Sequence, residues 1–182
     1  MVFIDVRGFT ALSERLPPRE AVSRLNRFYN LAAETVFRLD GTLDKLIGDE
    51  VMAFFGAPFR AEDHQARAVQ AALDIVSAVE AMVGDGDSLH VGGGVATGEV
   101  FMGNVGEGEV QDFTVIGDVV NTAARLQAAA GPGEVLATEE TYRQVAQRFA
   151  DAPQRIIEVK GKSAPLAVRV LRSSHSARDS SA

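Results

Sequence analysis

Residues 42–56 read TLDKLIGDEVMAFFG, and this stretch decides the fold. The segments on either side of Gly48 and Asp49 are apolar and rich in strand-forming residues, which predicts two strands joined by a tight turn. Asp49 then lies at the tip of a buried hairpin. The fold, and not only the solvent, holds its carboxylate in place.

A second acid interrupts the apolar start of the chain, where residues 1–10 read MVFIDVRGFT. If this first strand lies beside the hairpin, Asp5 and Asp49 meet at one edge of a sheet, and their oxygens suit hard divalent cations. Each Asp taken alone is more simply a turn or capping residue. The two together, with their glycines, favour a site that handles phosphates.

The composition of the chain excludes several classes of protein. The chain has 182 residues and 46% hydrophobic content, enough for one domain with a substantial core. It has no cysteine, and its three histidines share no ligand-like spacing, so a metal would be bound by oxygen. The net charge of −7 argues against nucleic-acid binding. With no bilayer-length apolar run and no signal peptide, we expect a soluble, cytoplasmic domain without a membrane segment.

Hydrophobic periodicity predicts the order strand, two helices, two strands, helix, three strands, helix, strand, helix, two strands. The long amphipathic helices are expected at residues 19–39 and 62–83, and a further helix at 139–148. Thr10 and Asp118 are expected as helix caps. This order predicts an α+β sandwich of the ferredoxin-like kind, a mostly antiparallel sheet with helices covering one side. The first strand begins abruptly, as a truncated strand would.

The second informative stretch is residues 112–126, DFTVIGDVVNTAARL, which predicts a strand passing through a turn into a helix. Asn121 and Arg125 are four residues apart, so a hydrogen-bonding amide and a fixed cation share one helix face. Such a pair could stabilise negative charge that develops on a phosphoryl group during a reaction. Taken alone, a surface Arg beside a helix-interior Asn is the simpler interpretation. The many glycines of residues 92–108 match neither a Walker loop nor a dinucleotide fingerprint.

These stretches together resemble the catalytic domain of the class III nucleotidyl cyclases, the adenylyl and guanylyl cyclase family. The resemblance spans residues 2–172, and its motifs occur in the family's order: FIDVRGFTALSE, DKLIGDEVMAFFGAP, EDHQARAVQAAL, TGEVFMGNVG, FTVIGDVVNTAARL and VKGK. It implies that residues 1–172 form one catalytic domain. Residues 173–182 are small and polar, and are expected to be a disordered tail.

The resemblance implies a set of residues that hold the metals and the triphosphate. Asp5, Asp49 and the main-chain carbonyl of Val6 correspond to ligands of two divalent cations, Mg or Mn. The residues that match phosphate-binding positions are the turn formed by Gly8, Phe9 and Thr10, together with Lys160. Glu50, beside Asp49, is expected to be an exposed turn residue.

The resemblance also implies residues that read the base and stabilise the transition state. Lys45 matches the purine-reading lysine, and Thr114 occupies the position of its partner. An ammonium donor suits adenine N1 but opposes the N1–H of guanine, which favours ATP. Asn121 corresponds to the residue that orients the ribose, and Arg125 to the one that stabilises the transition state. Many adenylyl cyclases carry Asp where this chain has Thr114, and some family members with threonine respond to bicarbonate, a candidate effector.

The implied reaction converts ATP to 3′,5′-cyclic AMP and pyrophosphate by metal-assisted attack of the ribose 3′-hydroxyl. In the family, one subunit supplies the metal aspartates and the other the purine and transition-state residues, so a chain with both sets implies a head-to-tail homodimer. One alternative is a non-catalytic, nucleotide-binding dimerisation module, although every catalytic position is filled here. The other is a guanylyl cyclase, which would need an acid in place of Lys45.

Overall fold

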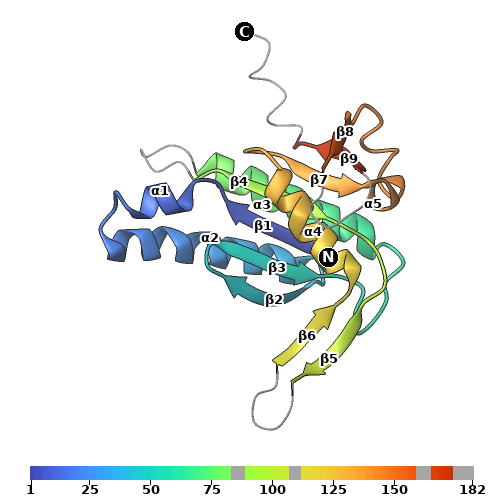
Figure 1. The fold of residues 1–182 in the computed structure, drawn as a ribbon, viewed down its shortest axis with the longest axis horizontal. Helices are drawn as coiled ribbons and strands as arrows, with labels where there is room; N and C mark the ends of the chain where they lie inside the picture. The colour runs from blue at the N-terminus through green and yellow to red at the C-terminus, as the bar shows by residue number, and fades with distance from the viewer. Residues whose placement is uncertain (83–88, 107–111, 159–164, 174–182) are drawn as a thin grey trace.

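The computed structural model describes residues 1–82, 89–106, 112–158 and 165–173, and its main feature is a seven-stranded sheet (Figure 1). The sheet consists of β1 (Val2–Val6), β2 (Thr42–Ile47), β3 (Glu50–Phe54), β4 (Val91–Val95), β7 (Val135–Thr138), β8 (Gln154–Ile157) and β9 (Leu166–Leu171). A separate hairpin, β5 (Phe101–Val105) and β6 (Asp112–Ile116), extends away from it. The helices are α1 (Phe9–Ser13), α2 (Pro18–Arg38), α3 (His64–Ala81), α4 (Asp118–Ala129) and α5 (Glu139–Arg143).

The strand order is β2-β3-β1-β4-β7-β9-β8. Every neighbouring pair is antiparallel except β4 and β7, which are parallel. The expected α+β fold, with its mostly antiparallel sheet and this order of elements, is therefore confirmed. The central position of β1 explains why its sequence is almost continuously apolar.

Helices cover both faces of the sheet, which corrects the expectation that they cover one side. Val2 and Ile4 of β1 belong to a core cluster with residues of α2 and α3. Phe3, which points to the opposite face, belongs to a second cluster with Ala123 and Leu126 of α4. The α4 helix therefore packs on the face that α2 and α3 leave uncovered, and candidate residues on α4 must act on that face.

Gly94 of β4 allows α4 to approach this second face closely. A Cβ atom built on Gly94 would lie 2.2 Å from the carbonyl oxygen of Ala123 and 2.3 Å from the amide nitrogen of Gln127. These are backbone atoms, which cannot move aside as a side chain can. A strand glycine at a close backbone approach accounts for the packing of α4 on β4.

The β2–β3 hairpin has the predicted form, with Gly48 and Asp49 between its two strands. Gly48 has φ +62°, a left-handed conformation that glycine adopts without steric cost. The end residues of the helices differ from expectation. Gly8, with φ +71°, precedes α1 in place of Thr10 as the cap, and Gly117 precedes α4 in place of Asp118. Helix α5 ends at Arg143, before the expected residue 148.

The sequence also predicted a disordered tail at residues 173–182 and no membrane segment. Residues 174–182 of the expected tail lie outside the described residues. Within the described ranges, no helix combines the length and apolarity needed to cross a membrane.

Candidate functional site

The two predicted metal-binding acids lie together at the end of β1. The register pairs Asp5 with Glu50, the residue after Asp49, and the Val6 amide donates a hydrogen bond to the Asp49 carbonyl at 3.3 Å. Burial and, after it, the neighbouring charge of Asp49 raise the pKa of Asp5 to about 6, against the opposing effect of Arg7. The sequence predicted that these two carboxylates meet at one edge of the sheet, and the structure places them together there.

Glu50 is a third acid in the same corner, and the expectation that it is an exposed turn residue was wrong. It is half-buried and is the first residue of β3, directly across from Asp5. Burial, followed by the charges of Asp5 and Asp49, raises the pKa of Glu50 to about 7. The corner therefore holds one more carboxyl group than the sequence-based assignment included.

The donor set of this corner fits hard divalent cations. Within the described ranges, no group of three or more acidic or histidine side chains forms a metal cluster. The predicted set instead has two carboxylates and one backbone carbonyl. Oxygen atoms are the ligands that such cations prefer, and a bound cation would offset the repulsion that raises the pKa of Asp5.

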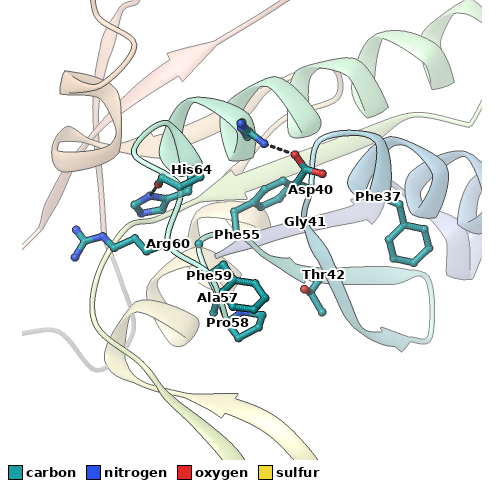
Figure 2. Close-up of a pocket in the computed structure, with 13 residues that line it drawn as sticks. Phe37, Asp40, Gly41, Thr42, Phe55, Ala57, Pro58, Phe59, Arg60 and His64 are labelled. Carbon is teal, nitrogen blue, oxygen red and sulfur yellow. Dashed lines mark hydrogen bonds and ion pairs between the residues drawn. The ribbon is translucent and has the colours of Figure 1, made fainter.

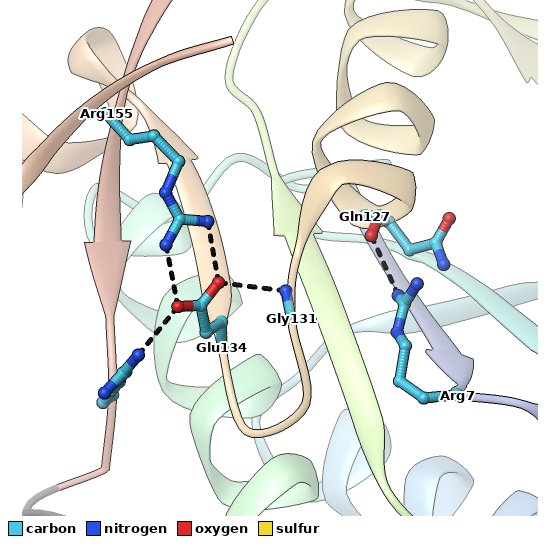
Figure 3. Close-up of polar contacts among 6 residues, drawn as sticks. Arg7, Gln127, Gly131, Glu134 and Arg155 are labelled. Carbon is cyan, nitrogen blue, oxygen red and sulfur yellow. Dashed lines mark hydrogen bonds and ion pairs between the residues drawn. The ribbon is translucent and has the colours of Figure 1, made fainter.

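Arg7 joins the acidic corner to the end of α4. Its guanidinium donates hydrogen bonds to the carbonyls of Gly92 at 3.1 Å and Gln127 at 2.8 Å, and its Nη1 lies 3.7 Å from Asp5 Oδ2. Figure 3 shows the bond to Gln127. A hydrogen bond from the Gln127 side chain lowers the pKa of Asp5, although burial and Asp49 outweigh it. These contacts hold the end of β1, and with it the Val6 carbonyl, against α4.

Tyr29 supports the hairpin tip from the other side. Its hydroxyl donates a hydrogen bond to the carbonyl of Gly48, the residue before Asp49. Burial, and after it the charge of Asp49, raises the pKa of Tyr29. The long helix α2 thereby restrains the turn that carries the second carboxylate.

The predicted purine-reading residues lie on the α4 side of the sheet. Lys45 of β2 pairs with Met52, which belongs to the α4-side core, so both point to that face. Thr114 of β6 donates a hydrogen bond to Asp44 at 3.0 Å, and Lys45 Nζ lies 3.9 Å from the same Asp44 oxygen. Asp44 thus connects the two predicted base-reading side chains.

The remaining predicted residues occupy the turn after β1 and the outer surface of α4. Gly8, Phe9 and Thr10 form the start of α1, where helix geometry leaves the first N–H groups without intrahelical partners. Asn121 is exposed and Arg125 is half-buried. Lys160 lies outside the described residues.

A pocket of about 610 Å³ lies elsewhere, at the end of the hairpin remote from Asp49 (Figure 2). Aromatic side chains contribute to its lining, among them Phe37, Phe55 and Phe59. An ion pair between Arg67 and Asp40 lies at its margin. None of the predicted site residues lines this pocket, so the candidate site is the open sheet face and not this cavity.

The comparison with known families identifies the class of protein. Residues 1–171 match the family described as the adenylate and guanylate cyclase catalytic domain. The chain belongs to this family, whose domains work as dimers on nucleotide substrates.

A relative of known sequence is similar to most of this chain. The uncharacterised protein Rv1318c of Mycobacterium tuberculosis is 35% identical over 181 residues, which cover 91% of this chain and 33% of that protein. The chain therefore spans about a third of the length of this curated relative.

Solved structures include cyclases of both specificities. The guanylyl cyclase Cya2 has a TM-score of 0.85 at 30% identity, covering 93% of this chain and 88% of its own. The adenylyl cyclase CyaB from P. aeruginosa has a TM-score of 0.83 at 33% identity, covering 94% and 92%.

Sequence reasoning missed three residues that organise the site: Arg7, Asp44 and Gln127. Each acts through contacts between residues far apart in the chain. The Arg7–Gln127 bond spans 120 positions and the Thr114–Asp44 bond spans 70. A sequence signal existed only for Arg7 and Asp44, which are charged residues inside otherwise apolar strands or at their ends.

Proposed function

We propose that this domain is an adenylyl cyclase, which converts ATP to 3′,5′-cyclic AMP and pyrophosphate. The observation that carries the proposal is the shared location of two residue sets. Asp5, which pairs with Glu50 beside Asp49, and Lys45 face the α4 side of the large sheet, and Asp44 links Lys45 to Thr114 of the β5–β6 hairpin. One set suits metal-bound phosphates, and the other suits a purine.

In the proposed reaction the acidic corner holds the two cations, Mg or Mn. Asp5 and Asp49 supply carboxylate oxygens, and the Val6 carbonyl supplies a main-chain oxygen that the Arg7 contacts keep in position. When bound, the cations supply Lewis-acid activation of the ribose 3′-hydroxyl and neutralisation of phosphate charge. Burial and the neighbouring charge of Asp49 raise the pKa of Asp5, and a bound cation would offset that repulsion, which supports the proposed metal site.

The other residues position the nucleotide and offset charge. The N–H groups at the start of α1, from Phe9 and Thr10, follow β1 directly in the chain and would hold phosphate oxygens. Asn121 would orient the ribose, while Arg125 and Lys160 would offset charge on the α-phosphate and leaving group. Positioning and electrostatics would supply most of the rate, so no covalent enzyme intermediate is needed.

The base preference rests on Lys45. Because Cya2 is a guanylyl cyclase and CyaB an adenylyl cyclase, similarity alone leaves both bases open. A lysine ammonium donates to adenine N1, whereas it would oppose the N1–H of guanine. We therefore propose ATP as the substrate. Bicarbonate stays a predicted effector, and its addition at constant pH would raise turnover.

We also propose a head-to-tail homodimer with two shared sites. The Gln127 end of α4 lies at the acidic corner, and Asn121 lies six residues earlier, about 9 Å along the helix. This arrangement directs the Asn121 end of α4 toward the β5–β6 hairpin and away from its own acidic corner. Exposed Phe101 and Phe113 on that hairpin provide apolar surface for a second chain.

The test of this function is product formation from ATP and from GTP, with Mg and with Mn, over a range of protein concentrations. We expect cyclic AMP as the main product, with a specific rate that rises with protein concentration. A clear preference for GTP would contradict the base assignment. Nucleotide binding with no product at any concentration would instead support a non-catalytic binding module.

A further inference from the structure

The carboxylate of Asp44 lies between the two predicted base-reading residues because β2 contains an irregularity at that point. The pairing of β2 with β3 shifts between Leu43 and Lys45, so Asp44 is the extra residue of a β-bulge. Bulges re-aim side chains. The Asp44 side chain is only 4% exposed, and its Oδ2 lies 3.9 Å from Lys45 Nζ.

The same Asp44 oxygen accepts the hydroxyl proton of Thr114, at 3.0 Å. A threonine hydroxyl has one proton and two lone pairs, so it can donate only once. An ionised carboxylate has no proton to offer, which fixes the direction of this bond. With its proton held by Asp44, the Thr114 oxygen can present only lone pairs to a ligand.

We propose that Asp44 is a positioning residue for base specificity: it orients the Thr114 hydroxyl so that threonine presents an acceptor to the base. The inference rests on the proposed function and deepens it. Adenine carries an amine donor at position 6, whereas guanine carries a carbonyl acceptor. The oriented hydroxyl therefore accepts from adenine and opposes guanine. Without this contact the Thr114 hydroxyl could bind either base. Asp44 restricts it to adenine.

Asp44→Asn tests this role, because the amide can donate to Thr114 and so release the hydroxyl proton toward the base. We expect the ratio of kcat/KM for ATP to kcat/KM for GTP to fall by about tenfold. A purely structural role would lower both values together and leave the ratio unchanged. Asp44→Ser, which replaces the carboxylate by a shorter side chain with a hydroxyl that can also donate, should shift the ratio in the same direction.

Two controls isolate the hydroxyl. In a Thr114→Val background there is no hydroxyl to orient, so Asp44→Asn should leave the ATP/GTP ratio unchanged. Asp151→Asn makes the same chemical change at an exposed surface position and should leave both rates at the wild-type level. A ratio that changes equally with and without the Thr114 hydroxyl would overturn the proposal.

A binding measurement separates this proposal from the proposed reaction. The dissociation constants of 3′-deoxy-ATP and 3′-deoxy-GTP, which lack the attacking hydroxyl, are measured by calorimetry for the wild type and Asp44→Asn. A change in the ratio of these two dissociation constants supports the role of Asp44, whether or not the wild type forms a cyclic product. Absence of product from the wild type would contradict only the cyclase function. An active wild type whose ratios do not respond to Asp44→Asn overturns the role of Asp44 alone.

Discussion

At the scale of single residues, the acidic corner destabilises the fold while it provides oxygen ligands for the proposed cations. Asp5, Asp49 and Glu50 bring three carboxyl groups into one half-buried region, and burial together with mutual repulsion raises the pKa of Asp5 to about 6 and of Glu50 to about 7. A fold selected for stability alone would avoid such a cluster. Its presence at the end of the central strand indicates a site whose residues are kept for chemistry.

Replacing one of these acids should separate the two effects. Asp49→Asn removes a charge beside Asp5, so the metal-free variant should melt at the wild-type temperature or above it near pH 8. Turnover should be lost, because the amide is a poor ligand for a hard cation. Thermal melting in a chelator and product formation with Mg measure the two outcomes. A variant with metal-dependent turnover would contradict the metal-ligand assignment.

The raised pKa of Asp5 makes the stability of the metal-free protein depend on pH. Asp5 ionises near its ordinary value of 3.8 in the unfolded chain but near 6 in the native protein. The native state therefore binds more protons between these values, and the free energy of unfolding of metal-free protein falls as pH rises from about 4 to about 6. Asp49→Asn should make this fall smaller. A steeper fall in the variant would contradict the account.

At the scale of elements, Glu134 holds the second half of the sheet together (Figure 3). Its carboxylate accepts two hydrogen bonds from Arg155 of β8, both at 2.8 Å, and one from Arg172 after β9, also at 2.8 Å. The Gly131 amide donates another at 2.9 Å. These bonds, with that from Arg155 the largest cause, lower the pKa of Glu134 to about 2.

Glu134→Gln should therefore destabilise the fold by about 2 kcal/mol at pH 7, a low figure for a charged network because both arginines are partly exposed. Because the native pKa is lowered from 4.5 to about 2, the wild-type advantage is present above pH 4.5 and is lost as pH falls toward 2. Urea unfolding at pH 7 and pH 3 measures the difference. An advantage that grows on acidification would show that the network does not act through the carboxylate charge.

The β5–β6 hairpin should contribute to dimerisation. Phe101 is 61% exposed on this hairpin, whereas Ile156 of β8, at the far edge of the sheet, is 72% exposed and serves as a matched control. Phe101→Glu should weaken the dimer, so that activity falls at low protein concentration and recovers at high concentration. Ile156→Glu should have little effect. Sedimentation and activity at several concentrations measure both, and equal effects would exclude a specific contact at Phe101.

At the scale of the whole molecule, the sequence predicted the order and type of the elements because apolar periodicity is a local property. The pattern shows which face of a helix is buried but not which face of the sheet it covers, so the position of α4 was missed. That position depends on Gly94, whose missing side chain matters only against the backbone of a segment about 30 residues away. Likewise, Arg7 and Asp44 became interpretable only when their distant partners, Gln127 and Thr114, were in place.

The central claim is that each site combines the acidic corner of one chain with α4 of another. Asp5→Ala should be inactive, and Arg125→Ala should lose on the order of 10²- to 10³-fold in rate, since it removes one preorganised cationic group. In a heterodimer of the two variants, one site carries both substitutions and the other carries neither.

The measurement that tests this claim most directly is cyclic AMP formation by that heterodimer, purified through a different tag on each chain. We predict about half the wild-type specific activity, from one intact site of two. If each site were built within a single chain, both sites of the heterodimer would be defective. A demonstrated heterodimer with no more activity than the separate variants would therefore contradict the account.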